Sequence, residues 1–223
     1  MNPEIHSLRQ TIPAAWRAMP GLRTILMPQI VTPQWKIVNL GYSAPKFRKL
    51  HLEIIESEEL QVLHCVMYPR IDYDVPILGI DLVAYGGATA FAIADACPVT
   101  DALAPAYPVD DLLEKHGLCP VAREDMPPWG QEIFSDRCVL ARRPVPPGFP
   151  AYALDVMARH LDFARAAPVV EDPVRVHGNH VRFCDCQLRN VRTRAALAKQ
   201  LGFQRAEQYM QAVMFDAPQL PKS

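Results

Sequence analysis

The chain has 223 residues, of which 50% are hydrophobic and 21% are charged, and its formal net charge is −1. These values are ordinary for a globular protein and exclude a chain too polar or too charged to build a core. No segment reaches the length of a membrane span, and the N-terminus, MNPEIHSLRQ, lacks the apolar core of a secretion signal. We therefore expect a cytoplasmic protein with no membrane partner.

The predicted elements are strands in the first half of the chain, with helices before and after them. The first helix is expected at residues 6–18, interrupted near Pro13 because proline lacks a backbone donor. Apolar alternation predicts strands at 35–40, in further runs to residue 96, and at 133–142 and 181–186. Helical spacing predicts helices at 109–116, 152–167, 193–201 and 205–215. This order predicts an α+β fold in a single domain, residues 1–223, with a mostly antiparallel sheet.

Three β-rich runs, at 47–55, 60–70 and 77–87, place Glu53, His64 and Asp81 among apolar neighbours. If the first two runs form a hairpin that turns between residues 58 and 59, Glu53 lies opposite His64. Side chains opposite each other on one face have Cβ atoms about 5 Å apart. His51 then lies on the same side, and Asp81 joins the group if its strand pairs nearby. This pattern favours proton chemistry.

Each of these residues also has a structural interpretation. A histidine in a strand is more often a hydrogen-bonded core residue than a catalyst, and Glu53 beside Lys49 fits a solvent-facing carboxylate. Asp81 is harder to explain in this way, because apolar residues surround it and aspartate is a poor strand former. Three ionisable residues on neighbouring strands together favour a chemical role.

The sequence gives little support for a bound cofactor. Gly86 and Gly87 lack the third glycine and the following helix of a dinucleotide site, so we expect neither a nicotinamide nor a flavin. His177, His180, Cys184 and Cys186 are ligand types that zinc prefers, but their spacing fits no familiar zinc motif, and we expect no metal. The six cysteines show no disulfide framework and are expected to be free, mostly buried thiols.

The charges are unevenly distributed, although their sum is close to zero. Residues 5–52 contain seven Lys or Arg and no acid, and residues 175–205 contain seven against Asp185 alone. Such tracts suit an anionic partner or substrate, and the alternative is a pair of solvated faces. No motif supports a nucleic-acid partner.

Several unusual strings resemble those of the ferredoxin-dependent bilin reductases. They lie in the family's order over residues 47–216. They are FRKLHLEI, VLHCVMYP, LGIDLVA before two glycines, AIAD, PPWG with EIFS, Phe183-Cys184 with Gln187 and Asn190, Thr193-Arg194, and YMQAVMFD. Within the family the chain looks most like the members that form phycocyanobilin.

The resemblance implies a three-layer α/β/α sandwich with a central antiparallel sheet that works as a monomer. It implies no bound cofactor, biliverdin IXα as substrate, and single electrons from reduced ferredoxin, an acidic protein that docks transiently. The expected product is phycocyanobilin, a four-electron product. The alternatives are phycoerythrobilin or a tetrapyrrole carrier without catalysis. Heme oxygenase upstream and a phytochrome or phycobiliprotein downstream are further implied partners.

The resemblance also implies roles for individual residues. Asp81 would protonate and bind the lactam edge of the bilin, His64 would share its proton network, and Glu53 would donate a proton to the D-ring vinyl group. His51 and Asn190 would organise hydrogen bonds.

Three further positions complete the implied substrate site. Arg192 would bind a propionate, because a guanidinium can hold a carboxylate with two hydrogen bonds. Gln187 and Met214 would contact the bilin. Val191 stands where relatives often have aspartate, and this departure bears on which product forms.

Overall fold

The computed structural model describes residues 2–100 and 107–220, so part of the proline-rich segment 97–150, residues 101–106, lies outside the described residues. Within these residues, eight strands form one antiparallel sheet in the order β1-β3-β4-β5-β6-β7-β8, with β2 paired to β3. The strands are β1 (Arg23–Ile25), β2 (Ile30–Val31), β3 (Lys36–Ala44), β4 (Phe47–Glu56), β5 (Leu60–Pro69), β6 (Ile77–Tyr85), β7 (Ala88–Cys97) and β8 (Val139–Arg142).

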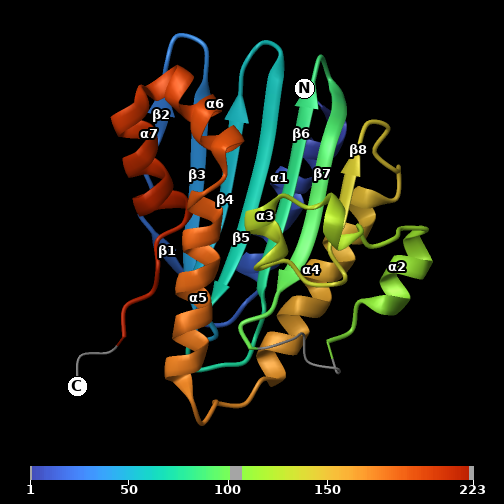
Figure 1. Cartoon of the computed structure of the whole chain (residues 1–223), viewed down its shortest axis with the longest axis vertical. Helices are drawn as coiled ribbons and strands as arrows, with labels where there is room; N and C mark the ends of the chain where they lie inside the picture. The colour runs from blue at the N-terminus through green and yellow to red at the C-terminus, as the bar shows by residue number, and fades with distance from the viewer. Residues whose placement is uncertain (1, 101–106, 221–223) are drawn as a thin grey trace.

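Helices cover both faces of this sheet (Figure 1). The helices are α1 (Pro3–Arg17), α2 (Asp110–His116), α3 (Pro128–Gln131), α4 (Phe149–Ala166), α5 (Pro173–Leu188), α6 (Val191–Leu201) and α7 (Phe203–Tyr209), with a 3₁₀ turn η1 (Arg123–Asp125) and a π-helical turn η2 (Met210–Met214). We call the face under α5, α6 and α7 the front face, and the face under α1 and α4 the back face (Figure 1). The predicted three-layer α+β sandwich is therefore confirmed.

The back face is an apolar core. Alternate residues of β4 and β5, such as Leu52 and Leu63, pack with Ile12 and Trp16 of α1 and with Phe149 of α4, and all five are fully buried. Burying such side chains stabilises the fold by roughly 1.5–3 kcal/mol each. Because side chains alternate along a strand, the residues between them project to the front face.

The hairpin that joins β4 to β5 is held by one serine. Ser57 N donates to Leu60 O at 2.9 Å, and Leu60 N donates to Ser57 Oγ at 2.9 Å. These bonds close the turn between Glu56 and Leu60, which fixes which residues of the two strands face each other.

Two expected boundaries differ from the structure. Helix α1 continues through Pro13, because Pro13 is buried with Ile12 and Trp16, and this packing offsets the lost backbone hydrogen bond. The predicted strand at 133–142 pairs only over Val139–Arg142. Its first part instead continues the turn after α3, where Phe134 N donates to Gly130 O at 2.8 Å.

The predicted strand at 181–186 is wrong, because these residues belong to α5. Asp172 caps the helix by accepting a hydrogen bond from Arg175 N at 3.0 Å. The buried positions Val176, His180, Phe183 and Cys184 follow helical spacing. Cys184 and Cys186 therefore lie on opposite sides of the helix and do not share a face, as the strand would have required.

The cysteines are free thiols, as the sequence analysis predicts. All six cysteines are free, and five of them are buried. Among the residues with described positions, no helix is long and apolar enough to cross a membrane.

Candidate active site

Three adjacent strands place Glu53, His64 and Asp81 in line across the front face. Glu53 of β4 pairs with His64 of β5, and His64 pairs with Asp81 of β6. His51 pairs with Val66, as the expected hairpin register requires. The register predicted from the sequence is confirmed, and the strand of Asp81 pairs next to that of His64.

His64 and Asp81 form a direct ion-pairing contact. His64 Nδ1 lies 2.7 Å from Asp81 Oδ1. The other ring nitrogen, His64 Nε2, is buried and has no hydrogen-bond partner among the described residues. The Asp81 contact therefore fixes the ring through Nδ1 and leaves Nε2 without a partner.

Glu53 lies in a more enclosed place than Asp81. The Glu53 residue is 1% exposed, whereas the side chain of Asp81 is 35% exposed. On the side of Asp81, a Cβ added to Gly79 would meet no atom within 4 Å. The cluster is therefore open beside Asp81 and closed around Glu53.

A second polar chain runs from Glu53 to His51 through two residues that the sequence analysis missed. The hydroxyl of Tyr209 is in hydrogen-bond contact with Glu53 Oε2 and lies 3.0 Å from Asn39 Oδ1. His51 Nε2 lies 2.7 Å from the same Asn39 oxygen. Because an amide oxygen only accepts, His51 carries its proton on Nε2, and its buried Nδ1 has no partner within the described part of the chain.

Burial and neighbouring charges shift the pKa values of Glu53, His64 and His51. Burial raises the pKa of Glu53, although the charge of His64 and the hydrogen bond from Tyr209 partly oppose this. Burial acts to lower the pKa of His64, but the carboxylates of Asp81 and Glu53 outweigh it and raise the pKa above its usual value. Burial and the charges of His64 and Lys49 lower the pKa of His51. Compared with free side chains, these pKa shifts favour the protonated forms of Glu53 and His64 and the neutral form of His51.

The C-terminal segment 209–216 covers this cluster. The Phe215 ring packs edge-on against the His64 ring, with centroids 5.7 Å apart. The buried Met214 lies beside it, and Tyr68 of β5 donates to the Met214 carbonyl at 2.7 Å. The segment therefore holds the Phe215 ring against His64.

Two basic residues of β4 fix this segment to the sheet. Arg48 donates to the Asp216 carboxylate at 2.9 Å and to the Asp216 carbonyl at 2.7 Å. Lys49 pairs with the same carboxylate and donates to the Val213 carbonyl at 3.0 Å. These charge-assisted bonds keep Tyr209 and Phe215 in register with the front face.

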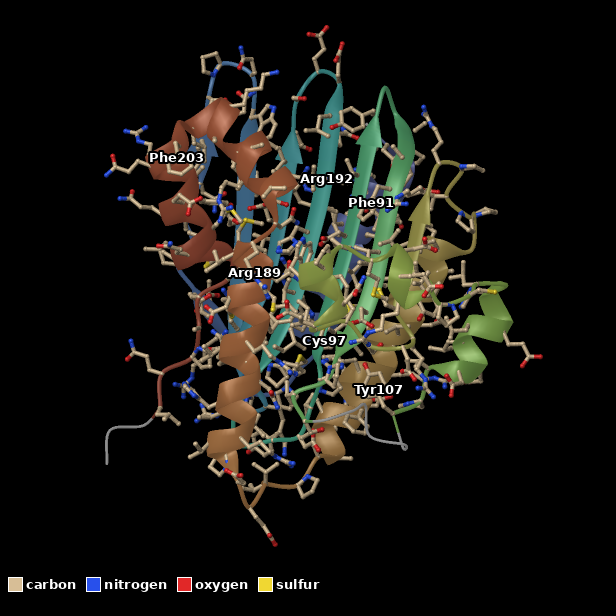
Figure 2. The ribbon with its side chains drawn as sticks, in the orientation of Figure 1. Phe91, Cys97, Tyr107, Arg189, Arg192 and Phe203 are labelled. Carbon is tan, nitrogen blue, oxygen red and sulfur yellow. The ribbon has the colours of Figure 1, made fainter. Side chains whose placement is uncertain are left out.

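The other predicted substrate-binding residues lie where α5 ends and α6 begins. Gln187 is half-buried, Arg192 is exposed, and Asn190 caps α6 by accepting hydrogen bonds from Arg192 N and Thr193 N at 3.2 and 3.3 Å. Figure 2 shows Arg192 in front of the sheet, in line with β5 in that view. In residues 2–100 and 107–220, no hydrogen bond joins these three residues to Glu53, His64 or Asp81.

The sequence analysis missed Tyr209 and Asn39 for different reasons. Tyr209 opens the string YMQAVMFD, but helical spacing there gave no reason to single out its hydroxyl. Asn39 interrupts an apolar strand and is 2% exposed. A buried amide in a strand requires partners, which is a signal that the sequence analysis did not use.

The residues described here offer no group of three or more His, Cys, Asp or Glu that could hold a metal ion. His177 Nε2 contacts the Pro218 carbonyl at 3.0 Å, and Cys184 Sγ contacts the Asp216 carbonyl at 3.6 Å. Cys186, on the far side of α5, contacts Arg189 at 2.7 Å. The structure therefore does not bring these three residues together as a ligand set.

Comparisons with known proteins match nearly the whole chain. A family model described as "Ferredoxin-dependent bilin reductase" matches residues 27–216. A phycocyanobilin:ferredoxin oxidoreductase of Gloeobacter violaceus is 33% identical over 235 residues, which cover 98% of this chain and 92% of that protein. A protein of the same name from a Synechococcus species is 32% identical over 236 residues, which cover 98% of this chain and 94% of that protein.

The fold has a solved counterpart. Phytochromobilin synthase from tomato, solved in complex with biliverdin, superposes with a TM-score of 0.66 at 16% sequence identity, covering 95% of this chain and 83% of that chain. At this identity the likeness concerns the fold alone.

Proposed function

The chain belongs to the ferredoxin-dependent bilin reductase family, and from this premise we propose that it reduces biliverdin IXα to phycocyanobilin. The whole chain acts as one domain, and electrons arrive singly from a reduced ferredoxin. Each reduced double bond takes two electrons and two protons. Because the ferredoxin supplies only electrons, the protein must supply the protons.

The observation that carries this proposal is the cluster of three ionisable side chains on adjacent strands. Glu53, His64 and Asp81 stand side by side, and the environment favours the protonated forms of Glu53 and His64. General acids whose pKa lies near the working pH donate protons efficiently. A carrier that only held a tetrapyrrole would have no use for several buried proton donors.

We assign the roles of the cluster as follows. Asp81, which is partly exposed and beside open space, protonates the lactam edge of the bilin, and His64 replenishes it through the 2.7 Å contact. Glu53 protonates the D-ring vinyl group. His51 and Asn190 orient the bilin and the water around it.

The unpartnered ring nitrogens support a polar ligand at this place. His64 Nε2 and His51 Nδ1 are buried without partners among the described residues. Buried polar atoms of folded proteins almost always have hydrogen-bond partners. A bilin offers both pyrrole N–H donors and lactam carbonyl acceptors, which can pair with the acceptor of His51 and the donor of His64.

The remaining contacts come from the helices of the front face. Arg192 binds a propionate carboxylate, and Gln187 and Met214 contact the tetrapyrrole. An exposed basic surface on α5, α6 and α7 receives the ferredoxin. Its members are Arg182, Lys199 and Arg205. Complementary charge accelerates such encounters.

The test is an anaerobic incubation of the purified protein with biliverdin IXα, a ferredoxin and its reducing system. Products are identified by absorbance and chromatography. Phycocyanobilin is the expected product. Formation of phycoerythrobilin would support the reaction class but contradict the proposed product. Val191, which is 68% exposed at the start of α6, would then be the first position to mutate. Tight binding of biliverdin without reduction would overturn the proposal in favour of a carrier.

A further inference from the structure

The side-chain amide of Asn39 has a fixed orientation. Its Nδ2 donates to the Pro28 carbonyl at 2.7 Å, and its backbone exchanges hydrogen bonds with the Gln29 side chain at 2.7 and 3.2 Å. Because Nδ2 faces a carbonyl, Oδ1 must face His51 and Tyr209. Asn39 thus presents a buried acceptor to the site.

The Asn39 oxygen can only accept, whereas the Tyr209 hydroxyl has one hydrogen and lies between two acceptors. If this hydrogen points to Asn39 Oδ1, at 3.0 Å, the Tyr209 oxygen can only accept from Glu53. Glu53 must then be a neutral carboxylic acid that donates its own proton. If Glu53 is ionised, the hydrogen must point to its carboxylate. The direction of one O–H bond therefore follows the protonation state of Glu53.

We infer that Tyr209 is a positioning residue for Glu53, with a hydroxyl that turns between Asn39 and Glu53 as Glu53 holds or releases its proton. In the loaded state Glu53 donates to Tyr209, and Tyr209 donates to Asn39. After Glu53 gives its proton to the bilin, Tyr209 donates to the carboxylate that remains. One bond rotation keeps the Tyr209–Glu53 hydrogen bond in both states, whereas the bond from Tyr209 to Asn39 exists only in the loaded state, and Asn39 still accepts from His51 in both.

The proton and electron balance of the step is simple. The vinyl group takes up two electrons, one from each of two ferredoxin molecules, and two protons, one from the Glu53 carboxyl and one from solvent. Glu53 becomes a carboxylate and regains its proton from solvent through the cluster. Tyr209 keeps its own proton throughout, in keeping with its pKa, which burial and the charge of Glu53 raise.

The surroundings of Glu53 explain why the anion needs this partner. The titratable groups that face Glu53 are His64 from β5, Asp81 from β6 and Tyr209 from α7, with His51 on the same strand. Glu53 is 1% exposed, so water cannot solvate its charge. Hydrogen bonds to charged groups are roughly twice as strong as neutral ones, so Tyr209 stabilises the anion more than the acid.

The test compares Tyr209→Phe with the wild-type protein in two measurements. Infrared difference spectroscopy follows the carbonyl band of protonated Glu53 against pH, and Glu53→Gln identifies this band. We expect the band to persist to higher pH in Tyr209→Phe, because the anion has lost its donor. Reduction of biliverdin is expected to slow roughly 10- to 100-fold, with a larger solvent deuterium isotope effect and unchanged bilin affinity.

Tyr68→Phe is the matched control, since it removes another buried tyrosine hydroxyl that binds the same C-terminal segment, at the Met214 carbonyl. It should leave the pH dependence of the Glu53 band unchanged. An identical Glu53 titration in Tyr209→Phe and wild type, or an equal shift in Tyr68→Phe, would overturn the inference. The inference rests on the proposed function for its rate effect alone. The titration needs no electron donor, so failure of the reductase assay and failure of this inference are distinguishable.

Discussion

Leu52 and Glu53 are neighbours in β4, and both are almost completely buried, at 0% and 1% exposure. Leu52 projects to the back face, into the core with α1 and α4. Glu53 projects to the front face, where it meets His64, Tyr209 and the C-terminal segment. The same strand thus has one face that packs hydrocarbon and another that buries ionisable groups.

The two faces of the sheet therefore differ in what they contribute: the back face stabilises the fold, and the front face holds the ionisable side chains. The back face gains free energy from apolar burial. The front face is less stabilising, because burying carboxyl and imidazole groups costs free energy unless they are paired or neutral. The apolar face holds the strands in register, and that register places Glu53, His64 and Asp81 side by side.

The largest expected effect is on catalysis from the front face. Asp81→Asn should lower the rate of biliverdin reduction by about 10²–10⁴-fold, because it removes a proton donor while keeping the size of the side chain. Biliverdin should still bind, as judged by its absorbance. Asp162→Asn, an exposed carboxylate of α4, is the control and should keep the wild-type rate. Full activity of Asp81→Asn would contradict the role given to Asp81.

The next effect is on stability from the back face. Leu52→Ala should lower the free energy of unfolding by about 2–5 kcal/mol, because it removes a fully buried side chain and leaves a cavity. Urea denaturation measures this loss. The rate of bilin reduction per folded molecule should stay unchanged at low temperature. A loss of rate with no loss of stability would break the separation of the two faces.

Glu53→Gln tests how burial of Glu53 makes the free energy of unfolding depend on pH. The folded protein raises the pKa of Glu53, so the folded state keeps a proton that the unfolded chain loses above about pH 4.3. Wild-type stability attributable to Glu53 is therefore complete below that pH and declines as pH rises through the folded pKa. Glutamine does not titrate, so the variant should gain relative stability at about 1.4 kcal/mol per pH unit in this window.

Denaturation of both proteins at several pH values measures this difference. Leu52→Ala is the matched control, because its stability loss should be the same at every pH. A constant difference between Glu53→Gln and wild type would show that Glu53 has the same pKa in the folded and unfolded chains.

The smallest expected effect concerns the docking of ferredoxin. Arg205→Glu reverses an exposed charge on α7 and should slow electron transfer from ferredoxin a few-fold at low salt, with the difference vanishing at high salt. Arg17→Glu makes the same change on exposed α1, on the back face, and should have no such effect. Rates measured against ferredoxin concentration at two ionic strengths decide this. Equal slowing by both variants would indicate a general charge effect and no front-face docking.

Much of the candidate site followed from local patterns. Alternation along β4 and β5, with Ser57 in the turn, was enough to predict that Glu53 faces His64. Antiparallel pairing between neighbouring strands then brought in Asp81. The strand predicted at 181–186 failed because a short apolar run also fits the buried side of an amphipathic helix, and the cap at Asp172 lies outside that window.

The sequence by itself determined the α+β fold, the strand register and the three ionisable residues of the cluster, because a side-chain period of two and a short hairpin leave few alternatives. Tertiary structure alone decided which residues distant in the sequence meet this part of the sheet. Tyr209 lies 156 residues from Glu53, and Arg48 lies 168 residues from Asp216. Such contacts depend on how helices pack across a sheet, which no local pattern encodes. Packing of the C-terminal segment therefore enclosed Glu53 and His64, while the side of Asp81 stayed open.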